Sequence, residues 1–288
     1  MTSLTESGQN PAASARGRVR LGPAEAAIFE TFVVPRYLTL FGELALEMIA
    51  ESSDAQIVHI QCRTGYPDRG LMMRLPGAHL YGVDGSSHAL ELARAKAATM
   101  PGMVSNYIQA DTLPSPLPAG AFSHAITLHP LANPADRGGM LAEFSRLLAP
   151  RGQALIAMPL RGSFQEIADL LREYALKYEA EDVSKAVEAA VLLRPSVEML
   201  GAELEEAGFH YVDVELRTHT LKFQSGRDLF EDPIARFLVL PEVRLNLGLA
   251  EPDKAFSYVR EAIDKYWSEG TFELTVNVGC ASGRREEG

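Results

Sequence analysis

Cysteine and long apolar runs are scarce in this sequence of 288 residues. Its two cysteines, Cys62 and Cys280, are too few for a disulfide framework, and Cys62 has no partner at zinc-ligand spacing. We therefore predict a cytoplasmic protein without a metal site. The longest apolar runs, such as 155–160 and 237–240, are far shorter than the roughly 20 residues that span a bilayer.

Basic residues are fewer than acidic ones, 27 against 38, and the formal net charge is −11. No dense block of Lys and Arg stands in the part predicted to fold, which excludes electrostatically driven binding of nucleic acid. Residues 1–22 lack the apolar core of a signal peptide, and we predict a disordered leader there. The three arginines of this leader indicate a solvated tail, with an interaction arm as the alternative (Arg16, Arg18 and Arg20).

Regular apolar patterns begin at residue 36 and cover the first half of the chain. Apolar side chains at helical spacing predict a helix over 36–51, and Pro35 suits its start. Short apolar runs then alternate with helical patterns, which is typical of a parallel sheet covered by helices. The strands are expected at 56–61, 79–83, 105–109, 122–128 and 153–158. Ser86 or Ser87 can cap the helix after the second strand. In such sheets ligands bind beyond the carboxyl ends of the strands.

The second half of the chain departs from this simple alternation. Period-two patterns predict a closing pair of antiparallel strands at 211–216 and 272–278. Three helices are expected before this pair, and a mostly helical insertion between its strands (163–178, 182–193, 196–207 and 225–270). We predict an α/β fold with a doubly wound, seven-stranded, mostly parallel sheet. Residues 23–288 are expected to form one domain, with helical additions at 163–193 and 225–270.

Aromatic side chains are prominent in the two helical additions. They are expected to line an apolar acceptor pocket, to pack the core of the insertion, or to form a dimer interface. They are Tyr174, Tyr178, Phe230, Phe237 and Trp267.

Three points along the frame carry candidate binding residues. The turn after the first strand ends in Thr64 and Gly65. Asp84 follows the second strand, where a carboxylate can accept hydrogen bonds from both hydroxyl groups of a ribose. Asp111 follows the third strand, where it can reach the edge of an adenine. These positions predict a nucleoside site at the carboxyl ends of the strands.

Together these features resemble class I S-adenosylmethionine-dependent methyltransferases, especially the small-molecule type of quinone and biotin-precursor biosynthesis. The resemblance covers about residues 36–160 and includes ADTLP at 110–114, AGAF at 119–122 and SRLLAPRG at 145–152. It implies a Rossmann-like fold and methyl transfer from S-adenosylmethionine to a small, partly apolar acceptor. The residues that it implies for the cofactor are Gly65, Asp84, Ala110 and Asp111, with His59 and Arg63 as weaker candidates.

The glycine-rich loop of that family is altered here. The family's loop resembles VLDVGCGTG, which aligns with residues 57–65 and places His59 at the acidic position and Gln61 and Arg63 at two of the glycines. Those glycines allow positive φ and a close approach of backbone to the methionine moiety. Arg63 is expected to turn to solvent or to bind a carboxylate, including that of the cofactor. His59 is expected to bond a backbone group or to remove a negative charge near the cofactor's ammonium group.

Two functional hypotheses follow from this altered loop. The first is an active methyltransferase, in which His129 at the end of the fourth strand is a candidate general base. The alternative for His129 is a strand-end histidine with a local hydrogen bond. The second hypothesis is a catalytically inactive pseudo-methyltransferase that serves as a binding or regulatory protein, and a different nucleotide-like ligand is a third option. The expected partners are a small-molecule acceptor or a protein, and a homodimer is also considered.

Overall fold

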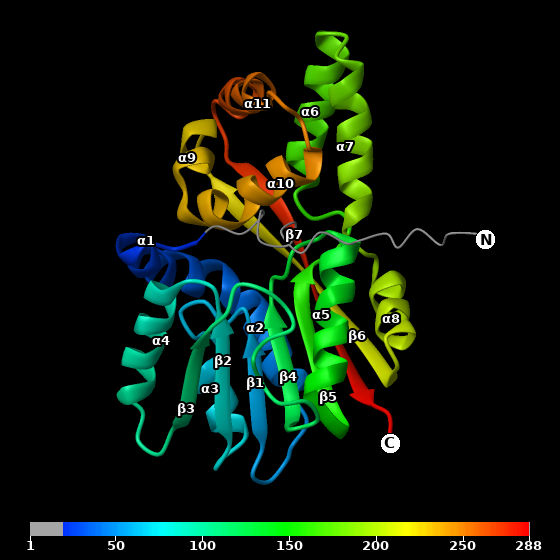
Figure 1. Ribbon diagram of the computed structural model, residues 1–288. Helices are drawn as coiled ribbons and strands as arrows, with labels where there is room; N and C mark the ends of the chain where they lie inside the picture. The colour runs from blue at the N-terminus through cyan, green and yellow to red at the C-terminus, as the bar shows by residue number, and fades with distance from the viewer. Residues whose placement is uncertain (1–19, 288) are drawn as a thin grey trace, which may run out of the picture.

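The computed structural model describes residues 20–287, and its centre is a seven-stranded sheet. The strands lie in the order β3-β2-β1-β4-β5-β7-β6, parallel except for β7, which pairs antiparallel with β5 and β6 (Figure 1). Their bounds are β1 Gln56–Ile60, β2 His79–Asp84, β3 Val104–Gln109, β4 Phe122–Leu128, β5 Leu148–Pro159, β6 Phe209–Phe223 and β7 Phe272–Arg285. The predicted fold class is confirmed.

Helices cover both faces of this sheet with separate apolar clusters. One face is packed by α2 (Thr39–Met48), α3 (Asp68–Arg74) and α4 (Ser87–Ala98), and the other by α5 (Pro134–Leu147) and α8 (Val197–Glu206). The side-chain oxygen of Ser86 accepts a hydrogen bond from Ala89 N and caps α4, as one of the two alternatives predicted. Because β1 lies between β2 and β4, the order of strands reverses there, and the carboxyl ends of β1 and β4 flank the expected binding crevice.

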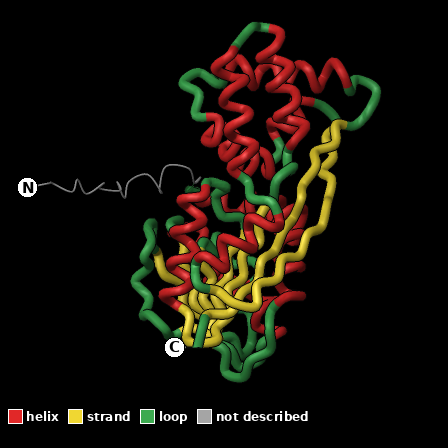
Figure 2. The backbone as a smooth tube through the Cα atoms, turned by 90° about the vertical axis from the view of Figure 1, so that its right-hand side faces the viewer, coloured by secondary structure: helices red, strands yellow, loops and turns green. Residues whose placement is uncertain are grey.

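A group of helices stands above the carboxyl ends of the strands, and we call it the helical cap (Figure 1). It comprises α6 Gln165–Lys177, α7 Glu181–Leu193, α9 Gly226–Glu231, a π-helical segment Ala235–Val239, α10 Leu240–Leu247 and α11 Asp253–Tyr266. Strands β6 and β7 run from the sheet into the cap (Figure 2) and are longer than predicted, because the cap helices bury their far ends, such as Phe223 and Phe272. No helix within residues 20–287 is long and apolar enough to cross a membrane.

The N-terminal segment differs from the sequence prediction. The helical path begins at α1 (Pro23–Ile28) and continues through a π-helical stretch, Phe29–Leu38, into α2. The prediction that Pro35 starts the helix was wrong: Pro35 lies inside the π-helical stretch, where the wider turns accommodate a residue without an N–H donor. Within the predicted disordered leader, Leu21 is buried and its carbonyl accepts a hydrogen bond from Ser86 Oγ at 2.7 Å. Residues 1–19 lie outside the described residues.

Candidate functional site

The loop that follows β1, residues 61–65, keeps the backbone of a glycine-rich turn although two glycines are absent. Gln61, Arg63 and Gly65 all have positive φ, at 62°, 48° and 78°. A left-handed backbone costs a residue with a side chain about 1–2 kcal/mol. At Gly65 a Cβ atom would lie 2.9 Å from that of Ala93, so glycine is required there for packing as well. The loop therefore has the expected shape, and the side chains of Gln61 and Arg63 are additions to it.

Arg63 connects the loop after β1 to the carboxyl end of β4. Its guanidinium donates from Nη1 to the carbonyl oxygen of Leu128 at 2.7 Å and from Nη2 to that of His129 at 3.0 Å, at the carboxyl end of β4. The side chain is half-buried, and burial lowers the pKa of Arg63, which still leaves it charged near neutral pH. The prediction that Arg63 turns to solvent was wrong, because two backbone carbonyls hold its guanidinium; the alternative that it binds a carboxylate, including that of the cofactor, stays a prediction.

Gln61 is the second added side chain, and it has unmet hydrogen-bonding capacity. It is only 5% exposed, and neither its amide nitrogen nor its amide oxygen has a hydrogen-bond partner among residues 20–287. A buried amide normally finds partners, because leaving one unpaired costs about 1–3 kcal/mol. The amide of Gln61 is therefore available to a molecule that enters the crevice.

The acidic candidates at the ends of β2 and β3 lie together. Asp84 accepts the backbone N–H of Ser86 on Oδ1 at 2.9 Å and that of Arg63 on Oδ2 at 3.0 Å, so it also fixes the glycine-type loop. Asp111 packs against Gly85, where a Cβ atom would approach Asp111 Oδ1 to 2.4 Å, and it pairs with Arg20 Nη2 at 2.8 Å. Ala110 N donates to the carbonyl oxygen of Asp84 at 3.0 Å, which ties the two strand ends to each other.

His59 belongs to a buried network that the sequence analysis missed. Its Nδ1 lies 2.7 Å from Oδ1 of Asp68 in α3, and Oδ2 of Asp68 accepts the hydroxyl of Tyr107 at 2.8 Å. Burial, followed by the charge of Asp68, raises the pKa of Tyr107. The expected bond from His59 to a backbone group was wrong. A carboxylate still faces position 59, but it comes from a residue nine positions along the chain.

His129 lies at the crevice, as predicted for the end of β4. It is buried, has a positive φ of 53°, and places Nε2 2.9 Å from the hydroxyl of Tyr37. Burial, with smaller effects from Arg63 and Arg194, lowers the pKa of His129 well below its usual value. Burial also raises the pKa of Tyr37. At neutral pH these two side chains therefore form an uncharged, hydrogen-bonded pair. Tyr37 was recognised in the sequence only as part of an apolar helix face.

The cap side of the crevice holds a charged pair that no sequence pattern indicated. Arg194 follows α7 and places Nη2 3.2 Å from Oε2 of Glu242 in α10, and both side chains are less than a tenth exposed. Oε1 of Glu242 accepts the N–H of Ala132 from the loop after β4 at 3.2 Å. The guanidinium of Arg194 stands 4.7 Å from the ring centroid of Phe164. This pair links the cap to the sheet beside the crevice.

The aromatic candidates of the cap mainly pack its own core. Tyr174 and Tyr178 contact Tyr258, with ring centroids 5.6 Å and 6.0 Å apart. Among the others, Phe230 contacts Phe256, Trp267 contacts Phe272, and Phe237 contacts Phe29 in the N-terminal segment.

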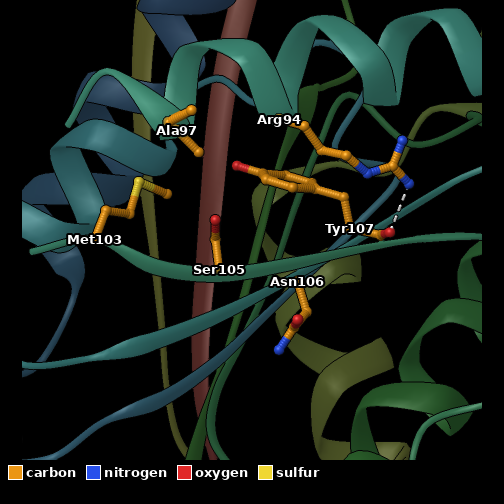
Figure 3. Close-up of a pocket in the computed structure, with 7 residues that line it drawn as sticks. Arg94, Ala97, Met103, Ser105, Asn106 and Tyr107 are labelled. Carbon is orange, nitrogen blue, oxygen red and sulfur yellow. Dashed lines mark hydrogen bonds between the residues drawn. The ribbon is translucent and has the colours of Figure 1, made fainter.

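A separate hollow of about 410 Å³ lies at the outer edge of the sheet, between α4 and β3 (Figure 3). It is lined by Arg94, Ala97, Ala98, Met103, Ser105, Asn106 and Tyr107. The guanidinium of Arg94 donates to the backbone carbonyl of Tyr107 at 2.7 Å and closes one side. None of the predicted site residues lines this hollow.

Comparison with known proteins finds similarity to methyltransferases. The model of a methyltransferase domain matches residues 58–156. The demethylmenaquinone methyltransferase of Thermus thermophilus is 29% identical over 176 residues, which are 57% of this chain and 79% of that protein. These similarities support a class I S-adenosylmethionine-dependent methyltransferase. S-adenosylmethionine is the cofactor of this family.

Solved structures share the fold at low sequence identity. A Bacillus halodurans protein proposed to be a methyltransferase aligns with a TM-score of 0.54 at 16% identity, over 85% of this chain and 98% of that one. Phosphoethanolamine N-methyltransferase 2 of Haemonchus contortus, crystallised with S-adenosyl-L-methionine, gives 0.50 at 15% identity, over 91% of this chain and 56% of that one. These similarities support the Rossmann-like methyltransferase fold.

Proposed function

We propose that this protein binds S-adenosylmethionine in the crevice between β1 and β4 and transfers its methyl group to a small, partly apolar acceptor beneath the helical cap. The observation that carries the proposal is the position of Asp84 beside a loop with glycine-type backbone. Each carboxylate oxygen of Asp84 accepts one backbone N–H, and a carboxylate offers about four acceptor sites in all. Acceptor capacity for two ribose hydroxyls therefore remains.

The methionine end of the cofactor also has candidate partners, although they differ from those of the family. The buried amide of Gln61 lacks partners and offers an oxygen to an ammonium group and N–H donors to a carboxylate. Arg63 uses two of its five N–H donors on Leu128 and His129, so the remaining donors can bind the carboxylate of the cofactor. The altered loop thus fits the polar groups of an amino acid, with side chains replacing close backbone contacts.

Beyond the cofactor, the uncharged pair of Tyr37 and His129 faces the acceptor in this proposal. When bound, the cofactor supplies an electrophilic methyl group, and the protein's main task is to hold the acceptor in line with it. A neutral imidazole hydrogen-bonded to a hydroxyl can take up a proton that an acceptor loses. Within this proposal His129 is a candidate base, and Tyr37 is the residue that positions its ring.

The bridge made by Arg63 favours a second candidate, an inactive pseudo-methyltransferase that acts as a binding or regulatory protein. A guanidinium fixed across the crevice repels the sulfonium and ammonium groups of the cofactor. Two hydrogen bonds from a charged donor, each with a net contribution of about 1.5–3 kcal/mol, resist its displacement. In this second candidate function, the guanidinium of Arg63 keeps the cofactor out of the crevice.

Calorimetric titration with S-adenosylmethionine and S-adenosylhomocysteine separates the two candidates. Micromolar binding by the unmodified protein, weakened in Asp84→Ala but not in the exposed control Asp169→Ala, supports the methyltransferase. Binding only after Arg63→Gly supports the inactive protein closed by Arg63. Absence of binding in every folded variant refutes the assignment of this crevice to the cofactor.

A further inference from the structure

Arg194 has hydrogen-bonding capacity that the described chain does not satisfy. It is 6% exposed, and its Nε has no hydrogen-bond partner within residues 20–287. Its ion pair with Glu242 uses one nitrogen at 3.2 Å, and Oε2 of Glu242 also lacks a well-directed hydrogen bond in that part of the chain. A guanidinium carries five N–H donors, and burying it is costly unless hydrogen bonds satisfy them.

Arg137, a neighbouring arginine, shows how the same fold satisfies a buried guanidinium. Arg137 is fully buried and donates to both carboxylate oxygens of Glu203 and to the carbonyl oxygens of Ala132 and Leu193. Leu193 directly precedes Arg194, so the two guanidiniums belong to the same region of the protein. The contrast indicates that the unmet donors of Arg194 are reserved for a molecule that the chain does not supply.

The surroundings of Arg194 contain charges of both signs. Arg63 donates a hydrogen bond to the carbonyl oxygen of His129, and after burial the charges of Arg63 and Arg194 both lower the pKa of His129. Glu242 is the carboxylate that acts on the pKa of Tyr37, next after burial. Asp84 faces Arg63 from the side of β2. Around the uncharged pair there are thus two guanidiniums and two carboxylates, so the unmet N–H donors of Arg194, rather than the net charge, indicate the kind of ligand: a group that accepts hydrogen bonds.

We propose that the acceptor molecule carries a carboxylate, which Arg194 binds beneath the helical cap. The planar fork of a guanidinium matches a carboxylate in two parallel hydrogen bonds. The guanidinium of Arg194 lies over the ring of Phe164, with its central carbon 4.7 Å from the ring centroid. This inference rests on the proposed function, because it places the ligand on the acceptor side of the same crevice.

Calorimetry with octanoate and its neutral analogue octanamide tests the inference. Octanoate combines one carboxylate with an apolar body, and it is expected to bind at least roughly 10-fold more tightly than octanamide. Arg194→Gln should remove this preference. Arg172→Gln, an arginine on the outer face of α6 that pairs with Asp169 and Glu188, should preserve it. Equal affinity for the two probes, no binding of either, or an unchanged preference in Arg194→Gln would overturn the inference.

A second variant keeps the test decisive if Arg194→Gln does not fold. In Glu242→Gln the competing carboxylate is lost while the guanidinium remains, so octanoate should bind more tightly and raise the melting temperature more than in the unmodified protein. A smaller response to octanoate in this variant contradicts the role of Arg194. Titration of each variant with S-adenosylhomocysteine separates the two proposals. If S-adenosylhomocysteine binds but the unmodified protein does not prefer octanoate, or Arg194→Gln keeps the preference, only the inference is overturned. If Arg194→Gln removes the preference but S-adenosylhomocysteine does not bind the unmodified protein, only the proposed cofactor site is overturned.

Discussion

Replacement of Arg63 with glycine tests the bridge across the crevice most directly. The variant loses two hydrogen bonds from a charged donor to Leu128 and His129, about 3 kcal/mol together at the low end suited to a half-buried group. It recovers about 1–2 kcal/mol by relieving the left-handed backbone at φ 48°. The greater freedom of glycine in the unfolded chain costs about 0.5–1 kcal/mol. We therefore expect a net loss of about 2 kcal/mol in the free energy of unfolding.

Urea unfolding measures this loss as a lower midpoint with an unchanged slope. Arg63→Lys is the matched control: it keeps the charge and the backbone strain but loses the two-pronged geometry, so it should be destabilised without admitting cofactor more readily. If Arg63→Gly is as stable as the unmodified protein, the bridge contributes nothing and the reasoning fails. If the glycine variant also binds S-adenosylhomocysteine more weakly, Arg63 is a cofactor ligand rather than a barrier.

Four further substitutions have definite expected outcomes. Asp84→Ala should weaken binding of S-adenosylhomocysteine by roughly 10- to 100-fold in calorimetry, because a charge-assisted contact is lost. Gly226→Ala places a Cβ atom 2.1 Å from the carbonyl oxygen of Arg260 and should cost about 1–3 kcal/mol. Gly138→Ala in α5, with open space around the new atom, should stabilise the protein by about 0.5–1 kcal/mol. A higher melting temperature for Gly226→Ala than for Gly138→Ala would contradict the packing described. Burial lowers the pKa of His129, so below about pH 6.5 the unfolded chain binds more protons than the folded one and stability falls as the pH drops. His129→Asn should flatten that part of the stability–pH curve, and an unchanged slope would show that His129 does not titrate on unfolding.

The frame of the fold was predictable because its signals are local. Each strand of the parallel sheet is a short apolar run, and each intervening helix carries its own apolar stripe. Asp84 and Asp111 could be placed because strand ends of one sheet meet at one edge. The full length of β6 and β7 was missed, since their far ends are strands only because the cap packs on them. The π-helical stretch around Pro35 was also missed, since tertiary packing overrides the usual effect of proline.

The charged groups of the site were beyond local signals. Arg194 and Glu242 meet from two cap helices 48 positions apart in the chain, and neither stands in a motif. The sequence showed that Arg63 replaces a glycine of the loop, but it did not show where the side chain points. The two carbonyls that hold its guanidinium lie at the carboxyl end of β4, 65 and 66 residues away. Long side chains in a crevice are placed by whichever partners the topology brings near, and spacing along the chain does not reveal those partners.

The altered residues of the loop are coupled to residues outside it, and His59 provides the test. Restoring the family's acid with His59→Asp places a second carboxylate against Asp68, whose Oδ1 now lies 2.7 Å from the imidazole in a site that is about 1% exposed. Two unit charges 4 Å apart repel by about 4 kcal/mol at the effective dielectric constant of a protein. The variant avoids this repulsion only if one of the two acids stays protonated. The single variant should therefore be strongly destabilised at pH 7 and regain stability at pH 5. His59→Asp combined with Asp68→Asn should recover most of the loss, because the neutral amide can still bond Tyr107. If the single and double variants unfold at the same urea concentration at pH 7, the two positions are independent. Coupling between them would mean that His59 and Asp68 form one rebuilt buried network, so that restoring the acid at position 59 alone cannot report on cofactor binding.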